Sequence, residues 1–280
     1  MKKILMAATV AALMSTSALA EITIGGDFEW SFQDSNGTST SAVDADLNIK
    51  PSMTTDTGLT IGADFNINQD GEDDGGNSLN ISGDFGKIQL GDVDSAIDAI
   101  DDVTNWGYAL TNGSPISTDH AAILSISPFA GATIHVSGAA DSNYGTTAGA
   151  GYAYAGTYAI GSIATVGYGK MENNDESSET IMNIKGSMGP IGLGYEKHTA
   201  TTTGGVDTDT TSMSAAFTIG ATTAAVELME TESAGTVSSD ETTLGLHHAI
   251  APGVVAFVEF TEDDKTASEE TTAIGIAMKF

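Results

Sequence analysis

The chain has 280 residues with 38 acidic and nine basic side chains, and its formal net charge is −29 at pH 7. A charge of this size and sign repels nucleic acid and anionic surfaces, and it attracts cations to the protein. The sequence contains no cysteine and no arginine, so disulfide bonds cannot contribute to its stability.

The first twenty residues have the pattern of a secretory signal. Two lysines precede an apolar stretch from Ile4 to Leu13, and Ala18-Leu19-Ala20 ends the segment as an A-x-A cleavage site. We therefore expect cleavage after Ala20, so that residues 21–280 form the folded part. No later window holds about eighteen consecutive apolar residues, which excludes a membrane-spanning helix.

The segment after this signal alternates apolar and polar residues. Apolar side chains fall on even positions, and polar or charged ones fall on odd positions: Ile22, Ile24, Phe28, Trp30 and Phe32 against Thr23, Asp27, Glu29 and Ser31. Successive side chains of a β-strand point to opposite faces, so this strand has one apolar and one polar face. A membrane barrel needs this arrangement, with lipid on one side and water on the other.

The same alternation recurs along the chain. It is found within residues 43–53, 59–67, 79–85, 87–91, 122–126, 132–137, 182–188, 191–195, 213–219, 226–228, 244–246, 254–260 and 274–280. Between Ala148 and Lys170 the phase is weakest, and we expect two strands there, carrying Tyr152 and Tyr154 on one and Ala164, Val166 and Tyr168 on the other. The total is sixteen strands, and a miscount by one hairpin in this region would leave fourteen.

The expected connections alternate between eight long polar ones, among them residues 198–210 and 231–240, and seven short ones rich in Gly and Pro. An even number of strands lets the first and last strands pair and close a cylinder. Charged strand residues all fall on the face opposite the apolar one: Asp27, Glu29, Asp44, Asp46, Lys50, Asp64, Asp84, Lys87, Lys185, Glu196, Glu227, Glu259 and Lys279. This partition is informative because a charge on the lipid face near the midplane costs about 2 to 4 kcal/mol.

A soluble β-sandwich is the alternative fold for such alternation. It would need an apolar interior, and the second face is too charged to pack against itself. The sequence therefore predicts an all-β transmembrane antiparallel β-barrel of about sixteen strands in the outer membrane of a diderm bacterium.

One gap in the alternation is too long for an ordinary connection. Residues 92–119 hold five acids, Asp92, Asp94, Asp98, Asp101 and Asp102, followed by Trp106 and Tyr108. Long connections of this kind are usually functional. The segment before the gap, Gly83 to Asp92, resembles the strand-turn-strand that precedes the constriction loop of Gram-negative general porins, and the terminal Phe280 is similar to their C-terminal assembly signal.

This resemblance implies a homotrimer of barrels in which the third long loop, residues 92–119, folds into the lumen and narrows it. The acids Asp92, Asp94, Asp98, Asp101 and Asp102 would then face the wall across a water-filled constriction. The family usually places arginines on that wall; here the candidates for a basic wall are Lys50, Lys87 and Lys185. Carboxylates above low-dielectric walls attract cations, so we expect a cation-preferring pore for ions and small hydrophilic solutes, without a cofactor.

Two alternatives stay open for these features. The acidic run could be a solvated surface loop, and the whole protein could be a non-conducting structural or adhesive protein of the outer membrane. The Asp/Gly-rich segment Asp70 to Gly76 could also bind calcium, although its spacing does not match an EF-hand loop.

An enzymatic function is not expected. The five histidines show no metal-ligand spacing such as HExxH, and there is no thiol for zinc binding or nucleophilic catalysis. His247 and His248 alternate across the predicted sheet, so both cannot face one site, and we interpret them as strand residues without a special role. We therefore expect no catalytic residues and no metal site.

Overall fold

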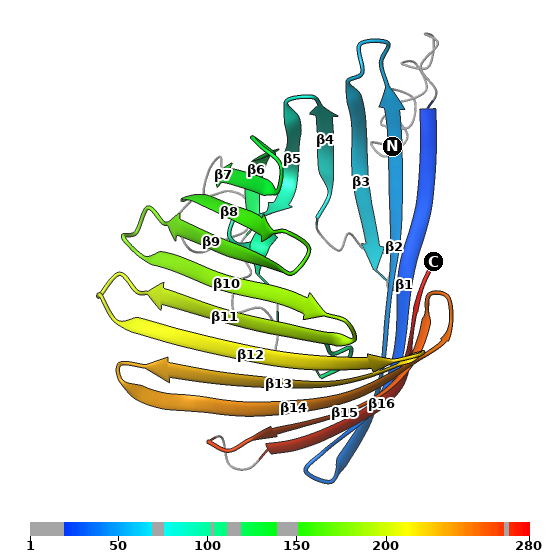
Figure 1. Cartoon of the computed structure of the whole chain (residues 1–280), viewed down its shortest axis with the longest axis vertical. Coiled ribbons are helices and arrows are strands. Elements are labelled where there is room, and N and C mark those ends of the chain that lie inside the picture. Colours follow the sequence, from blue (N-terminus) through cyan, green and yellow to red (C-terminus); the bar gives the residue numbers. More distant parts are fainter. Residues whose placement is uncertain (1–19, 69–75, 102–103, 111–118, 139–150, 266–268) are drawn as a thin grey trace, which may run out of the picture.

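The computed structural model describes residues 20–68, 76–101, 104–110, 119–138, 151–265 and 269–280. Its strands form one closed antiparallel barrel in which neighbours in sequence are neighbours in space, and β1 pairs with β16 (Figure 1). Asp27 lies opposite Lys279 and Ser35 lies opposite Thr271 along this closing seam. The predicted count of sixteen is confirmed, and fourteen is excluded because both uncertain strands, at 152–160 and 164–172, are present.

The sixteen strands of the described residues differ in length. Their bounds are β1 Ala20–Ser35, β2 Thr38–Thr54, β3 Thr60–Asn68, β4 Ser78–Gly83, β5 Gly86–Asp94, β6 Asp119–Ile126, β7 Ala132–Gly138, β8 Tyr152–Ile160, β9 Ala164–Glu172, β10 Ser178–Met188, β11 Ile191–Thr201, β12 Asp207–Ile219, β13 Thr222–Ser233, β14 Thr236–Ala251, β15 Val254–Asp263 and β16 Glu269–Lys279. A single 3-10 turn, η1 Asp98–Ile100, lies between β5 and β6. No helix in the described residues is long and apolar enough to span a membrane.

The two faces of the barrel are as the alternation predicts. Large apolar side chains such as Ile24 and Leu246 are exposed on the outside, whereas Ser31, Glu227 and Glu259 are buried on the inside. Asp84 is an exception, because it lies in the turn between β4 and β5. The outer face also carries two lysines near strand ends. Lys170 lies opposite Tyr154, with its Nζ 2.6 Å from Glu172 Oε1, and Lys197 lies opposite Met182, with its Nζ 2.9 Å from Asp209 Oδ2.

The prediction of long polar connections is wrong at several hairpins. Residues 231–240 were expected to form a loop, yet β13 and β14 are joined by Ala234 and Gly235 alone, with φ values of 50° and 78°. Positive φ at both central residues is the geometry of a two-residue hairpin turn. The expected loop at 198–210 likewise shrinks to residues 202–206. The apolar alternation ends before the strands do, because the β-branched Thr residues beyond it favour strands and backbone pairing continues.

The wall of the barrel is uneven in height (Figure 1). β1, β2 and β14 have 16, 17 and 16 residues, whereas β4, β6 and β7 have six, eight and seven. The proposed calcium-binding segment, residues 70–76, precedes β4 and lies outside the described residues except for Gly76.

Candidate functional site

A segment between β5 and β6 lies inside the barrel and follows its inner wall. We call residues 95–110 the lumen loop; the structure describes 95–101 and 104–110. β5 continues to Asp94, so Asp92 and Asp94 are strand residues and not part of this loop as the sequence suggested. The loop contacts inward-facing residues from β7 round to β15, at three places along its length.

The first contact is apolar. Ile97 and Ile100 are buried in a cluster with Ala155, Met171 and Ile181, which come from the inner faces of β8, β9 and β10. Ile97 packs against a glycine of the barrel wall, Gly169 of β9. A Cβ added at Gly169 would lie only 2.7 Å from Ile97 Cγ2. A larger residue there would therefore push the loop away from the wall.

Two hydrogen bonds hold the backbone at this first contact. Ala96 N donates to Ser137 Oγ at 2.7 Å, and Asn183 Nδ2 donates to the carbonyl oxygen of Ile100 at 2.5 Å. His120 Nδ1 lies 2.7 Å from the same Ser137 hydroxyl. Buried backbone groups need such partners, because leaving one unsatisfied costs about 1–3 kcal/mol.

The second contact is made by Trp106. Its indole Nε1 donates to Ser214 Oγ at 3.0 Å, and its backbone N–H donates to the carboxylate of Glu227. The edge of the ring lies against Gly192, where a Cβ would be 2.8 Å from the indole Cη2. The Nζ of Lys185 lies 5.4 Å from the ring centroid, within the range of a cation–π interaction.

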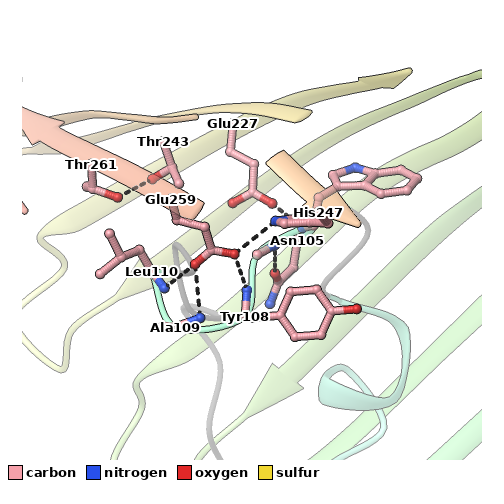
Figure 2. Close-up of polar contacts among 11 residues, drawn as sticks. Asn105, Tyr108, Ala109, Leu110, Glu227, Thr243, His247, Glu259 and Thr261 are labelled. Atoms are coloured by element: carbon pink, nitrogen blue, oxygen red, sulfur yellow. Dashed lines mark hydrogen bonds and ion pairs between the residues drawn. The ribbon is translucent and has the colours of Figure 1, made fainter. Parts of the chain in front are cut away.

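The third contact is centred on Glu259, whose side chain is buried (Figure 2). Three consecutive backbone N–H groups donate to its carboxylate: Tyr108 at 2.6 Å, Ala109 at 2.9 Å and Leu110 at 2.7 Å. His247 Nε2 lies 2.9 Å from the same carboxylate. A buried carboxylate with several donors makes charge-assisted hydrogen bonds, which are stronger than neutral ones.

Aromatic packing adds to the third contact. The Tyr108 ring stacks on Phe257, with centroids 5.4 Å apart, and meets His247 edge-on at 5.0 Å. Burial, and then the negative charges of Glu259 and Glu29, raise the pKa of the Tyr108 hydroxyl. Glu29 belongs to β1, so the loop at this point faces the part of the wall that it does not cover.

The predicted acids are divided among three places. Asp92 lies at the end of β5, where its carboxylate accepts a hydrogen bond from Gly76 N at 3.0 Å, and Asp94 is exposed two residues later. Asp98 begins η1 and Asp101 follows it, both half-buried on the lumen loop. Asp102 lies outside the described residues. The structure thus puts Asp98 and Asp101, but not Asp92 and Asp94, on the loop.

The predicted lysines do not form one cluster. Lys50 is on β2 with its Nζ 4.0 Å from Asp64, Lys87 is on β5 opposite Ser82 and Ser125, and Lys185 is on β10 over Trp106. Of these three lysines, Lys185 is the one that contacts the described part of the lumen loop. A continuous basic wall is therefore not formed by these three residues.

We call β16, β1, β2 and β3 the bare wall, because the contacts made by the described part of the lumen loop do not reach these strands. On its inner face Glu29 lies directly opposite Asp44 of β2, and its neighbour on β16 is Ala277. Asp27, next along β1, lies between Asp46 and Lys279. Like charges placed directly opposite each other are destabilising. The pair of Glu29 and Asp44 therefore does not stabilise the barrel.

The sequence analysis missed the wall residues that hold the loop. The alternation predicts that Glu227 and Glu259 face inward but does not connect them with the loop, and it gives no role to His247. The one available signal was an inward position occupied by an apolar residue, as in the Ile181-Met182 pair. Such a position on a water-lined face indicates that something apolar covers it.

Phe280, the predicted assembly signal, extends the last strand by one residue. Its backbone N and O pair with Gly26 of β1 at 3.0 Å each. The ring is exposed on the barrel surface.

A closed barrel that is apolar outside and charged inside, with a loop held in its lumen, is a transmembrane channel. The model of the Gram-negative porin family matches residues 7–268. The chain belongs to this family, and it is therefore a β-barrel protein of the outer membrane and a channel protein, not a member of an enzyme family.

Solved porin structures have the same fold. One porin refined at 1.8 Å has 19% sequence identity and a TM-score of 0.73, and an engineered variant of the Rh. blastica porin has 17% and 0.74. A second engineered Rh. blastica variant has 16% and 0.73. Each alignment covers 93% of this chain and 100% of the other. No curated protein sequence gives a significant match.

Proposed function

We propose that the barrel is a water-filled channel that prefers cations and passes ions and small hydrophilic solutes down their gradients. The observation that carries the preference is the pair Glu29 and Asp44 on the bare wall, whose cross-strand neighbours among the described residues include no cation. Such carboxylates above a low-dielectric wall concentrate cations and repel anions. The chain has no arginine to offset them.

The lumen loop supplies the opposite side of the constriction in this proposal. Asp98 and Asp101 lie on it, and Asp102 belongs to the same run of acids. Lys185 is directed to Trp106 and Lys50 to Asp64, so neither lysine forms a positive wall facing the loop. The solute path then runs between the loop and the bare wall.

Reversal potentials in planar bilayers under a KCl gradient test this preference. The double variant Glu29→Gln, Asp44→Asn should shift the reversal potential toward zero, while Asp264→Asn, which removes an exposed acid beyond the end of β15, should shift it less. Equal shifts would contradict the assignment to the bare wall. An electrically silent protein would instead support the rival, a non-conducting structural or adhesive surface protein.

We also propose that the barrel assembles as a homotrimer through its low wall. A transmembrane β-strand needs about 9–11 residues, and β4, β6 and β7 have six, eight and seven. Lipid would leave part of this wall mismatched, whereas a second copy could cover it. Cross-linking and unheated gel migration should give a trimer band; a monomer in both would contradict the proposal.

Phe280 is proposed as the assembly signal. Replacing it with Ala keeps the backbone pairing to Gly26 but removes the exposed ring. We expect less folded protein in the outer membrane and more unfolded precursor, measured by heat-modifiable gel migration of membrane fractions. Phe217→Ala, which removes another exposed phenylalanine from the outer face, is the control and should have a smaller effect.

A further inference from the structure

Two cavities flank Trp106 on the side of the lumen loop that faces the chain ends. The first, of about 360 Å³, is lined by Trp106, Lys185, Ile163 and residues that are small or hydroxylated, among them Thr165 and Ser187. The second, of about 440 Å³, lies on the other side of the segment Asn105–Tyr108. Both volumes are within the range of about 300–1,000 Å³ that is typical of small-molecule sites.

The indole in the first cavity is held in a fixed orientation. Its Nε1 donates to Ser214 and its edge lies against Gly192, so the ring cannot turn without losing both contacts. A ring fixed before binding offers a flat apolar surface at little entropic cost. The C–H groups of a saturated ring can therefore pack against its face through dispersion contacts.

Lys185 supplies the charge. The ion pairs found for lysines in the described part of the chain involve Lys50, Lys170 and Lys197, and none involves Lys185. Its ammonium instead lies over the indole. In a protein with so large an acidic excess, a lumen lysine placed beside an aromatic ring and a cavity points to an anionic group on a ligand.

The charge distribution along the bore favours anions at this end more than at the other. The inward-facing lysines lie in the halves of their strands nearest the chain ends: Lys50 near the end of β2, Lys87 at the start of β5, Lys185 near the end of β10 and Lys279 at the end of β16. Inward-facing acids lie at the opposite ends of the strands, as at Glu241 of β14, which pairs with Asp263 at the end of β15. An anion entering beside Lys185 therefore meets a less negative region.

We propose that the cavity between Trp106 and Lys185 binds a small ring-shaped solute that carries one carboxylate and several hydroxyls, a sugar acid. Its ring lies against the indole, its carboxylate accepts from the Lys185 ammonium, and Thr165 and Ser187 bind its hydroxyls. This inference rests on the proposed function in that the solute reaches the cavity through a water-filled lumen. The inference adds a specific binding site to the proposed function, in which selectivity comes from charge alone.

Fluorescence titration tests the site without requiring conduction. The chain has two tryptophans, and Trp30→Phe removes the one on the outer face, so the emission then reports Trp106. In detergent at low ionic strength, galacturonate should change this emission saturably. Galactose, which has the ring without the charge, and acetate, which has the charge without the ring, should bind at least about tenfold more weakly.

Variants separate the cavity from general electrostatics. Lys185→Met in the Trp30→Phe background should weaken galacturonate binding at least about tenfold, whereas Lys87→Met, which removes another inward-facing lysine, should leave it unchanged. Equal binding of acetate and galacturonate, no saturable change, or equal effects of the two variants would overturn the inference. A saturable change in a protein that is silent in bilayers would overturn the proposed function and leave the cavity assignment standing.

Discussion

The strands that the lumen loop contacts, β7 to β15, which we call the covered wall, and the bare wall both carry inward-facing carboxylates. The two sets of carboxylates have different partners. Glu227 and Glu259 on the covered wall are buried and accept backbone N–H groups of the loop. Glu29 and Asp44 on the bare wall face each other across a strand pair. An inward carboxylate thus accepts hydrogen bonds where the loop backbone reaches it. In the proposed channel, the carboxylates that the loop does not reach supply negative charge along the solute path.

The covered wall is also the one with recesses for the loop. Gly169 admits Ile97 and Gly192 admits Trp106. We therefore expect substitutions of the wall residues that contact the loop to alter the position of the loop. Substitutions of residues that line only the proposed solute path should alter ion selectivity and leave the loop in place.

The largest effect is expected for Glu259→Ala. It removes the acceptor of three backbone N–H groups and the partner of His247, and breaking such a buried charged network costs about 3–5 kcal/mol. We expect noisier single-channel currents and a lower unfolding temperature in heat-modifiable gel shifts. Glu241→Ala, on β14 nearer the rim, is the control. An equal fall in unfolding temperature in both variants would show that Glu259 has no special role in holding the loop.

A graded series at Gly169 tests the recess for Ile97. Gly169→Ala places a Cβ within 2.7 Å of Ile97 Cγ2, and Gly169→Val adds two methyl groups. Overpacking of this kind costs about 1–3 kcal/mol. The conductance should therefore differ from that of the wild type slightly in the Ala variant and more strongly in the Val variant. A Val variant with wild-type conductance and stability would show that the loop does not depend on this contact.

The triple variant Asp98→Asn, Asp101→Asn, Asp102→Asn should keep the loop in place and reduce cation preference. The physical reason is that three negative charges leave the loop side of the solute path while the wall contacts stay. Permeability ratios for potassium and chloride measure the change. An unchanged ratio would place these residues away from the constriction.

The smallest effect is expected from the titration of Tyr108. A raised pKa means that the neutral hydroxyl is favoured while the loop is bound, so its contribution is complete below the ordinary value of about 10 and is lost as pH rises through the higher value. Trp106 emission followed across alkaline pH should show loosening of the loop. Tyr108→Phe should remove that step, and a step that persists in the variant must come from another group.

The barrel could be predicted from the sequence because its two faces differ in chemistry at every second residue. Trp30 and Ser31 illustrate the rule, as one faces outward and the other inward. Strand ends could not be predicted, because beyond the lipid both faces are polar and only backbone pairing, as at Ala234 and Gly235, defines where a hairpin turns.

The loop's location could be predicted only from the family resemblance, and its attachment could not be predicted at all. Glu259 is separated from Tyr108 by 151 positions in the chain, and no local pattern links them. Acids on the loop looked functional because they cluster in sequence, whereas the wall glutamates that hold the loop are scattered over β13 and β15.

The reversal potential of the unmodified protein in a KCl gradient tests this account most directly. We predict single channels whose reversal potential has the sign of a potassium-preferring pore, with the preference falling as ionic strength rises and the carboxylates are screened. A reversal potential at zero or of the opposite sign, or the absence of conductance, would contradict it.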